Sequence, residues 1–446
     1  MGGTSGGGIS FDDTKDERIS ITKKEPTLLR DALAGITVAF SLLSKAIACS
    51  AMVGANPLVG IWSSVVMGLS SPVLRARSGV ICGAAAVVVV PLSALTTVHG
   101  TEYMTLCILL SAVLQGLFGM FRLAKTTADY VTHEVLSGFL NGLGGILFAS
   151  QAKVFKSAGV SGTLAPALSV ATLCYCIVQL LPRVTKAVPS SLVGLVVTSV
   201  IASALELPLA TLSSTAAAGT FSGGLSSLPR FISFGALRSQ ATSVDALKLV
   251  LPASISIMII ALVETLLAGK VVKDIIGNGD DDDENDDIPT RSVLAMSAGN
   301  IISASLGGFG GCGLIPQSVL NIKSGGGGTL SSISYALAMA SFVLFFAPLV
   351  GKIPEAVLAA IMLAVATDTV AWGPTLGAVR NMMHDPSAAA ATGSKVSRIQ
   401  RIIEFGALVI TSYICYFGNL AVGIVAGVAF QRGLLYIYRR FDSGTK

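Results

Sequence analysis

Two charged residues lie inside long apolar stretches of this sequence, and they are the first candidates for chemistry. Lys45 lies in SLLSKAIACSA, and Glu264 lies in MIIALVETLLAG. Charge in hydrocarbon is costly, so an ionisable residue in such a stretch is a functional candidate by default. Lys45 would attract an anion, whereas Glu264 would carry a proton, help to bind Na⁺ or neutralise Lys45. The alternative is a structural buried ion pair without further function.

Two Cys-Gly pairs each precede a short apolar stretch. Cys82-Gly83 opens the stretch 83–97, and Cys312-Gly313 opens the stretch 313–323. Both are too short to cross a bilayer, which takes about 20 residues. A helix that begins inside a membrane exposes unpaired backbone N–H groups at its positive end, and two such ends make an anion site without a formal charge. The alternative is that both glycines are packing breaks.

The composition indicates which kind of protein positions these groups. Of 446 residues, 52% are hydrophobic and 12% are charged, with a mean hydropathy of +0.76. Soluble proteins carry about 25% charged residues, and disordered chains need low hydrophobicity. The apolar runs are longer than the alternating segments of about ten residues found in membrane β-barrels. An all-α polytopic membrane protein is therefore predicted.

Other classes of site have little support. The seven cysteines show no metal or disulfide spacing, and no nucleophile–base pair or metal cluster is visible. We expect no enzyme, no cofactor, no metal site and no nucleic-acid partner.

Fourteen helical segments are predicted, and the basic residues orient them. With the N-terminus inside, 23 of the 30 Lys and Arg residues fall on the inside, 6 fall outside and Lys45 lies within the membrane. This asymmetry places both termini in the cytoplasm. The predicted segments are roughly 29–51, 57–74, 83–97, 103–121, 133–151, 166–182, 189–206, 246–269, 290–306, 313–323, 329–350, 353–371, 402–415 and 417–437.

Seven plus seven segments force the two halves, 28–210 and 243–440, into opposite orientations. Such an inverted repeat is a recurring plan among secondary transporters, and its interrupted helices mark the binding site. Here the third and tenth helices are the interrupted ones. Lys45 precedes Gly83 by 38 positions, and Glu264 precedes Gly313 by 49, or by 39 without a ten-residue polar insert. The two charges thus occupy near-equivalent positions and are expected to share the field of one anion site.

The remaining parts of the chain are polar. Residues 1–27 are Gly-rich and of mixed charge and are predicted to be a disordered cytosolic tail. Residues 278–289 are predicted to form an acidic, solvated cytosolic loop. The membrane domain spans 28–440.

Several segments of 28–437 resemble the SulP family, the bacterial, plant and algal relatives of the animal sulfate and anion exchangers. Each motif alone is weak, but together they are specific. They are RDALAGITVAF, AMVGANPLVGIW, VTHEVLSGFLNGLG, LPRVTKAVPSSLV, GGFGGCGLIPQSVLNIKSGGGGTLS and FFAPLVGKIPEAVLAAIM.

The resemblance implies a fourteen-helix fold with core and gate domains and elevator-like transport of sulfate, bicarbonate or another small anion. The anion site would lie between the third and tenth half-helices, walled by the first and eighth helices. Glu264, with Thr265, would couple transport to H⁺ or Na⁺. The residues carried over as substrate-binding are Lys45, Cys82, Gly83, Ala84, Ala85, Gly313, Leu314, Ile315, Gln317 and Ser318.

The sequence departs from the family pattern in several places. Ser44-Lys45 stands where Pro followed by Glu or Gln is frequent, and Ala84-Ala85-Ala86 offers backbone donors without a hydroxyl. Gln317 takes the place of an Arg common in animal members, so Lys45 is expected to supply that positive charge. We also expect no cytosolic STAS domain.

Three alternatives stay open at this point. A nucleobase transporter shares the inverted-repeat plan but would place more polar side chains at the half-helices. A non-transporting membrane motor or scaffold is a second alternative, and an intramembrane enzyme is a distant third. The leading hypothesis is a transporter that is coupled to H⁺ or Na⁺ or exchanges anions. The sequence does not select sulfate or bicarbonate, the coupling ion, the host membrane or the oligomeric state, for which a homodimer through the membrane domain is one expectation.

Overall fold

The structure is a computed structural model, and it describes most of the predicted membrane domain. The described residues are 28–123, 132–160, 162–185, 189–215, 243–276, 287–383 and 398–443, with five single residues between 221 and 231. The tail predicted at 1–27 lies outside these ranges, as does most of the acidic loop predicted at 278–289.

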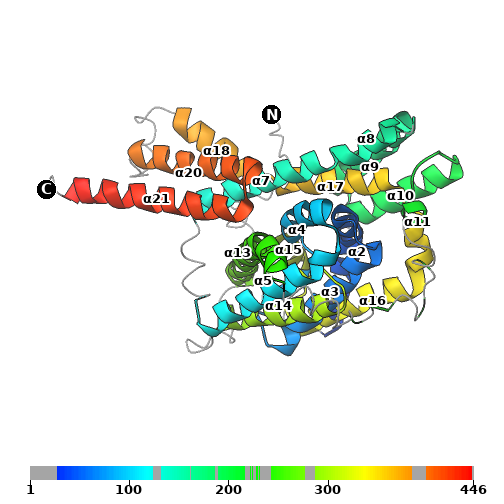
Figure 1. The fold of residues 1–446 in the computed structure, drawn as a ribbon, viewed down its shortest axis with the longest axis horizontal. Coiled ribbons are helices and arrows are strands. Elements are labelled where there is room, and N and C mark those ends of the chain that lie inside the picture. Colours follow the sequence, from blue (N-terminus) through cyan, green and yellow to red (C-terminus); the bar gives the residue numbers. More distant parts are fainter. Residues whose placement is uncertain are drawn as a thin grey trace. The chain divides into compact units, whose positions relative to one another are not determined.

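The described chain is mostly helical and divides into two compact units (Figure 1). The larger unit contains 23–128 and 147–365, and the smaller unit contains 1–22, 129–146 and 366–446. The helices of the larger unit are α2 (Leu28–Val53), α3 (Pro57–Val73), α4 (Ala86–His99), α5 (Glu102–Met120), α8 (Ala152–Val160), α9 (Leu164–Val184), α10 (Ser190–Ala204), α11 (Leu212–Thr215), α13 (Val244–Ile276), α14 (Ile288–Ser305), α15 (Ile315–Lys323), α16 (Thr329–Gly351) and most of α17 (Glu355–Thr369). The smaller unit holds most of α7 (His133–Ser150), together with α18 (Trp372–Met383), α20 (Arg398–Phe417) and α21 (Leu420–Ser443).

All fourteen predicted segments coincide with helices. The largest differences are at C-terminal ends, where α13 runs to Ile276 and α21 to Ser443. The short helices α8, α11 and α18 were not predicted. Within the described residues, nine helical stretches are long and apolar enough to cross a membrane. This supports a multi-pass membrane protein.

Two very short strands correct the all-helical prediction at its most informative place. Cys82–Gly83 forms β1 and Cys312–Gly313 forms β2, and the two pair antiparallel. Helix α4 therefore begins at Ala86 and α15 at Ile315, later than predicted. The physical reason is that residues engaged in a strand ladder are extended, so the helical turn starts only after them.

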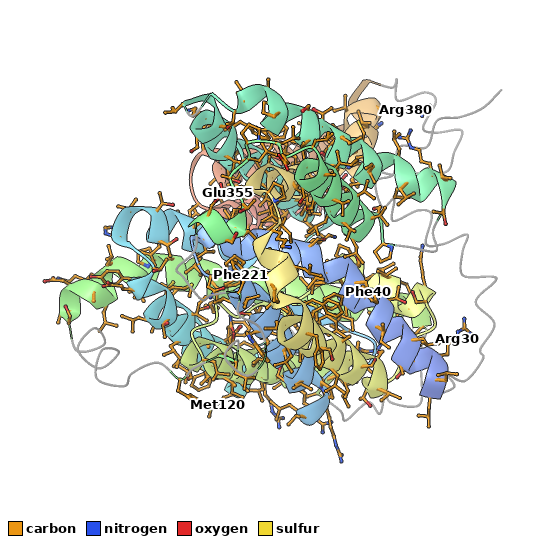
Figure 2. The ribbon with its side chains drawn as sticks, turned by 90° about the vertical axis from the view of Figure 1, so that its right-hand side faces the viewer. Arg30, Phe40, Met120, Phe221, Glu355 and Arg380 are labelled. Atoms are coloured by element: carbon orange, nitrogen blue, oxygen red, sulfur yellow. The ribbon has the colours of Figure 1, made fainter. Side chains whose placement is uncertain are left out.

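A carboxylate of α2 caps the start of α16 and joins two helices that are about 300 positions apart in the sequence. Asp31 Oδ1 accepts the backbone N–H groups of Gly327 and Gly328 at 2.8 and 2.9 Å, and Oδ2 accepts that of Ser331 at 2.9 Å. A carboxylate at a helix N-terminus pairs with orphan donors and with the helix dipole. Further along the same helices, Phe40, which is labelled in Figure 2, packs edge-on against Phe342. The ring centroids are 5.3 Å apart.

The smaller unit contains an equivalent polar cap on a helix. The Oδ1 of Asn141 in α7 accepts the N–H of Ala371, and its Nδ2 donates to Thr375 Oγ1 at 2.8 Å. Asn141 thereby holds the start of α18 against α7.

Candidate functional site

The candidate site is built around the pairing of the two Cys-Gly strands. Cys82 lies opposite Gly313, and Gly83 lies opposite Cys312. Exchanging the two Cys-Gly pairs leaves this register unchanged, as a local two-fold axis between them requires. The two segments, 230 positions apart in the sequence, are thus brought together with a helix leaving each one.

Hydroxyl groups from neighbouring helices hold the strand ends in place. Ser64 Oγ of α3 accepts the N–H of Ala84 at 3.0 Å, and Thr265 Oγ1 of α13 accepts the N–H of Gly313 at 2.9 Å. The N–H of Leu314 donates to Ile81 O at 2.8 Å. These three amides are therefore already satisfied and act as structural ties.

The next amides along the chain are available to a ligand. Neither Ala85, which precedes α4, nor Leu314, which precedes α15, caps its helix with a side chain. Among the described residues, no protein acceptor takes the backbone N–H groups of Ala86, Val87 or Ile315. Such donors, together with the positive end of a helix dipole, favour an anion.

Gln317 adds a side-chain donor to the start of α15. The residue is 4% exposed, and its side chain makes no hydrogen bond with another described residue. A side-chain amide without a protein partner is available to form hydrogen bonds with a polar ligand. Pro316, just before Gln317, has no backbone N–H to offer a ligand. The side-chain amide of Gln317 therefore adds a donor at this end of α15.

Close packing explains why glycine occupies the second position of each strand. A Cβ on Gly83 would lie 2.5 Å from Tyr335 Oη and 2.8 Å from Leu42 Cδ2. A Cβ on Gly313 would lie 3.0 Å from the Cα of Thr265. Larger residues would therefore require the strands or the facing side chains to shift.

Glu264 contacts the second strand directly. The Cys312 thiol donates to Glu264 Oε2 with a sulfur–oxygen distance of 3.1 Å, and the next residue on each element forms the Thr265–Gly313 bond. Glu264 is half-buried on α13. A carboxylate held this close to the helix start is suited to binding a proton or a cation beside an anion.

Lys45 is also half-buried, on α2. Its ammonium group interacts electrostatically with Cys49, one turn further along. Cys49 in turn lies within electrostatic range of Cys312. The pairing of Lys45 with Glu264 stays a prediction.

Most of the residues predicted to bind substrate are found at the strand pair or in the two helix starts that follow it. Ser318 differs from the others, because its hydroxyl donates to Leu314 O and accepts the N–H of Ile81. It ties α15 to the segment before β1 and has little capacity left for a ligand.

Sequence reasoning missed several residues of this region. Ser64, Tyr335 and the Cys312 thiol were not selected, although each lies at the strands. Asn300 was missed as well: it donates to Gly311 O and accepts the Gly311 N–H, fixing the approach to β2. The signal available in the sequence was a polar residue within an otherwise apolar helix.

Comparison with known proteins places this geometry in a family. Residues 28–382 match the family model described as the sulfate permease family. The chain belongs to the sulfate permease family. This confirms the resemblance inferred from the motifs.

The curated relatives are named as transporters. The putative sulfate transporter YbaR of Bacillus subtilis is 29% identical over 348 residues, covering 78% of this chain and 68% of that protein. The bicarbonate transporter BicA of Picosynechococcus is 28% identical, covering 77% of this chain and 62% of the relative. The chloroplastic sulfate transporter 4.1 of Arabidopsis thaliana is 24% identical, covering 90% and 57%. The matched region thus spans roughly six tenths to two thirds of these relatives' lengths.

Solved structures show the same fold. The transmembrane domain of a cyanobacterial bicarbonate transporter BicA matches with a TM-score of 0.69 at 22% identity, covering 90% of this chain and 99% of that domain. The structure of SLC26A9 matches with a TM-score of 0.70 at 14% identity, covering 96% and 70%.

Proposed function

We propose that this protein is a secondary active transporter of a small inorganic oxyanion, sulfate or bicarbonate. The observation that carries the proposal is the pair of helix starts beside the strand ladder, with unused backbone donors on α4 and α15. The relatives named as sulfate and bicarbonate transporters support the same substrate class. They also favour transport over catalysis.

The anion would be held mainly by backbone N–H groups. Ala86 and Val87 offer donors from α4, and Ile315 offers one from α15. The side-chain amide of Gln317 would add direction, and Lys45 would add positive charge. This arrangement suits a compact oxyanion with several acceptor oxygens.

Glu264 and Thr265 would carry the coupling ion, H⁺ or Na⁺. The support is the direct bond between Glu264 and the second strand, which brings the carboxylate next to the anion donors. Binding of a cation at Glu264 would offset its negative charge and favour binding of the anion, and by linkage the anion would favour binding of the cation.

The proposed mechanism is elevator-type alternating access. In support, the residues of the candidate site all lie in one compact unit, so the site would travel without coming apart. The finer topology belongs to the same proposal: fourteen membrane segments in a 7+7 inverted repeat, with core and gate domains, α4 and α15 as half-helices at mid-membrane, and both termini cytoplasmic. The symmetric register of the two Cys-Gly strands supports this repeat.

The test is flux in proteoliposomes that contain the purified chain. A panel of radiolabelled sulfate, bicarbonate, chloride and uracil is offered with Na⁺ and pH gradients imposed separately. We expect uptake of an oxyanion that is stimulated by one gradient. Uptake of uracil alone would favour the nucleobase alternative, and no flux under any gradient would favour a motor or scaffold; either result overturns the proposal.

A further inference from the structure

Two consecutive residues of α13 form hydrogen bonds with two consecutive residues of β2. Glu264 accepts the thiol of Cys312, and Thr265 accepts the N–H of Gly313. Both bonds join residues 48 positions apart, so the two contacts are in register along the two segments. We call this four-residue contact the clasp.

The clasp holds helix α13 and strand β2 in close contact. Thr265 is 2% exposed and Cys312 is fully buried. Because a Cβ on Gly313 would lie 3.0 Å from Thr265 Cα, no side chain separates the two backbones at this point. A displacement of β2 therefore moves the Glu264 carboxylate with it.

The first half of the chain places its corresponding cysteine differently. The thiol of Cys82 on β1 lies 3.9 Å from Ser71 Oγ of α3, a weak contact with a neutral hydroxyl. Cys312 instead donates to an ionisable carboxylate over a shorter distance. The thiol–carboxylate bond is thus a feature of the second half and does not follow from the strand pairing alone.

We propose that Cys312 is a positioning residue. Its thiol orients Glu264, and the dependence of transport on the coupling ion therefore requires this thiol. This inference rests on the proposed function and extends it. The thiol orients Glu264 toward the ion and fixes it to the strand that leads into the anion-binding helix α15. Because a thiol is a weak donor, the carboxylate is oriented but remains able to turn to a proton or cation.

The titratable groups around Glu264 determine which other residues could make transport depend on H⁺ or Na⁺. Cys312 on β2 faces it, Cys82 and Cys49 lie within electrostatic range of Cys312, and Lys45 interacts with Cys49. The helices packed on α13 are α4, α5, α14 and α15. The titratable residues of these four helices are His99, Glu102, Tyr103, Cys107, Arg291 and Lys323. All of them except Cys107 lie in the first or last turn of their helix.

The first experiment compares Cys312→Ala with Cys312→Ser in proteoliposomes. Uptake is measured against Na⁺ at fixed pH, against pH at fixed Na⁺ and against the anion. Losing a weak hydrogen bond of this kind changes a binding equilibrium by roughly threefold to tenfold. We expect Cys312→Ala to shift the half-saturating concentration of the coupling ion by about that factor, upward for Na⁺ because Glu264 loses its orientation and downward for H⁺ because the charged carboxylate loses a donor, with the anion KM changed less than about twofold. Cys312→Ser keeps a donor and is expected to restore most of the wild-type ion dependence.

The matched control is Cys176→Ala, which removes an exposed thiol of α9 and is expected to leave all three profiles unchanged. Unaltered ion dependence in Cys312→Ala, or an equal loss in both Cys312 variants, would overturn the inference. So would a wild-type protein that moves anions independently of both ions.

A second measurement does not depend on transport. The S–H stretching band of Cys312 is isolated as the infrared difference between the wild-type protein and Cys312→Ser. We expect this band to move to higher wavenumber in Glu264→Ala, because the thiol loses its acceptor. An unmoved band shows that the thiol does not bind Glu264 and overturns the inference. Absent wild-type flux with a shifting band would instead refute the proposed function and leave the thiol–carboxylate bond established.

Discussion

The hydroxyl of Ser318 in α15 accepts the backbone N–H of Ile81 at 3.0 Å, joining residues 237 positions apart. Ile81 is the residue immediately before β1, and Ser318 lies in the first turn of α15. Asn321, one turn further, donates to Gly79 O at 3.1 Å. The helix of the second half therefore holds the segment that leads into the strand of the first half.

Replacing Ser318 with Ala is expected to loosen this connection. The buried N–H of Ile81 would lose its acceptor, which costs about 1–3 kcal/mol of folding free energy. We expect a lower melting temperature in detergent and reduced uptake at every anion concentration. The control is Ser305→Ala, whose exposed hydroxyl bonds only within its own helix to Ile301 O. Wild-type stability in Ser318→Ala would mean that this bond does not hold the site.

The close approach at Gly83 gives a second prediction. In Gly83→Ala the new methyl group would lie 2.5 Å from Tyr335 Oη, so strand β1 or the Tyr335 side chain must shift. We expect uptake to fall by more than about tenfold, as for small misplacements of a positioned group. Adding Tyr335→Phe removes the nearest obstructing atom and should recover part of the activity.

Gly377→Ala is the matched control for this change, because nothing lies within 4 Å of a Cβ at that position. It is expected to leave uptake unchanged. If Gly83→Ala is as active as Gly377→Ala, the packing around β1 is looser than the structure indicates.

The carboxylate of Asp31 gives a prediction about stability. It accepts three backbone N–H groups at the start of α16, of which that of Ser331 is buried, and Asp31→Ala would leave all three without this acceptor. We expect a loss of about 2–3 kcal/mol or more, because bonds to charged groups are among the stronger ones. Asp31→Asn keeps a carbonyl acceptor and should cost less. Unfolding curves of the purified variants in detergent check the order wild type, Asn, Ala.

The sequence predicted the helices well and the site only in outline. Long apolar runs, such as the one around Glu264, determine helices through composition alone, so all fourteen segments were found. The Cys-Gly pairs at 82–83 and 312–313 were identified as breaks because Gly and short length are local signals. That they pair as strands was not predictable, since the pairing depends on two segments 230 positions apart meeting in space.

The hydrogen-bonding side chains show the same limit. Ser64 and Ser318 are ordinary residues in apolar helices, and only the fold gives their hydroxyls the N–H groups of Ala84 and Ile81. Lys45 and Glu264 stood out because charge is rare in such segments. Their roles in binding and coupling are still predictions, which the last two experiments address.

Lys45 is expected to contribute to anion binding through its charge. Lys45→Gln removes that charge with a side chain of similar length, so we expect the anion KM to rise roughly tenfold with a smaller change in kcat. Lys45→Arg keeps the charge and should retain most of the affinity. The measurement is radiolabelled uptake, corrected for the amount of reconstituted protein. An unchanged KM in Lys45→Gln would assign Lys45 a structural role.

Glu264 is expected to connect transport to the driving ion. Glu264→Gln keeps the size of the side chain and an acceptor for the Cys312 thiol but cannot bind a proton or balance a cation. Downhill anion exchange should therefore persist, while uptake driven by a Na⁺ or pH gradient should fall to the level of a gradient-free control. Measuring both fluxes in the same proteoliposomes separates loss of coupling from loss of folding. If driven uptake survives in Glu264→Gln, the coupling ion binds elsewhere in the protein and the proposed role of Glu264 is wrong.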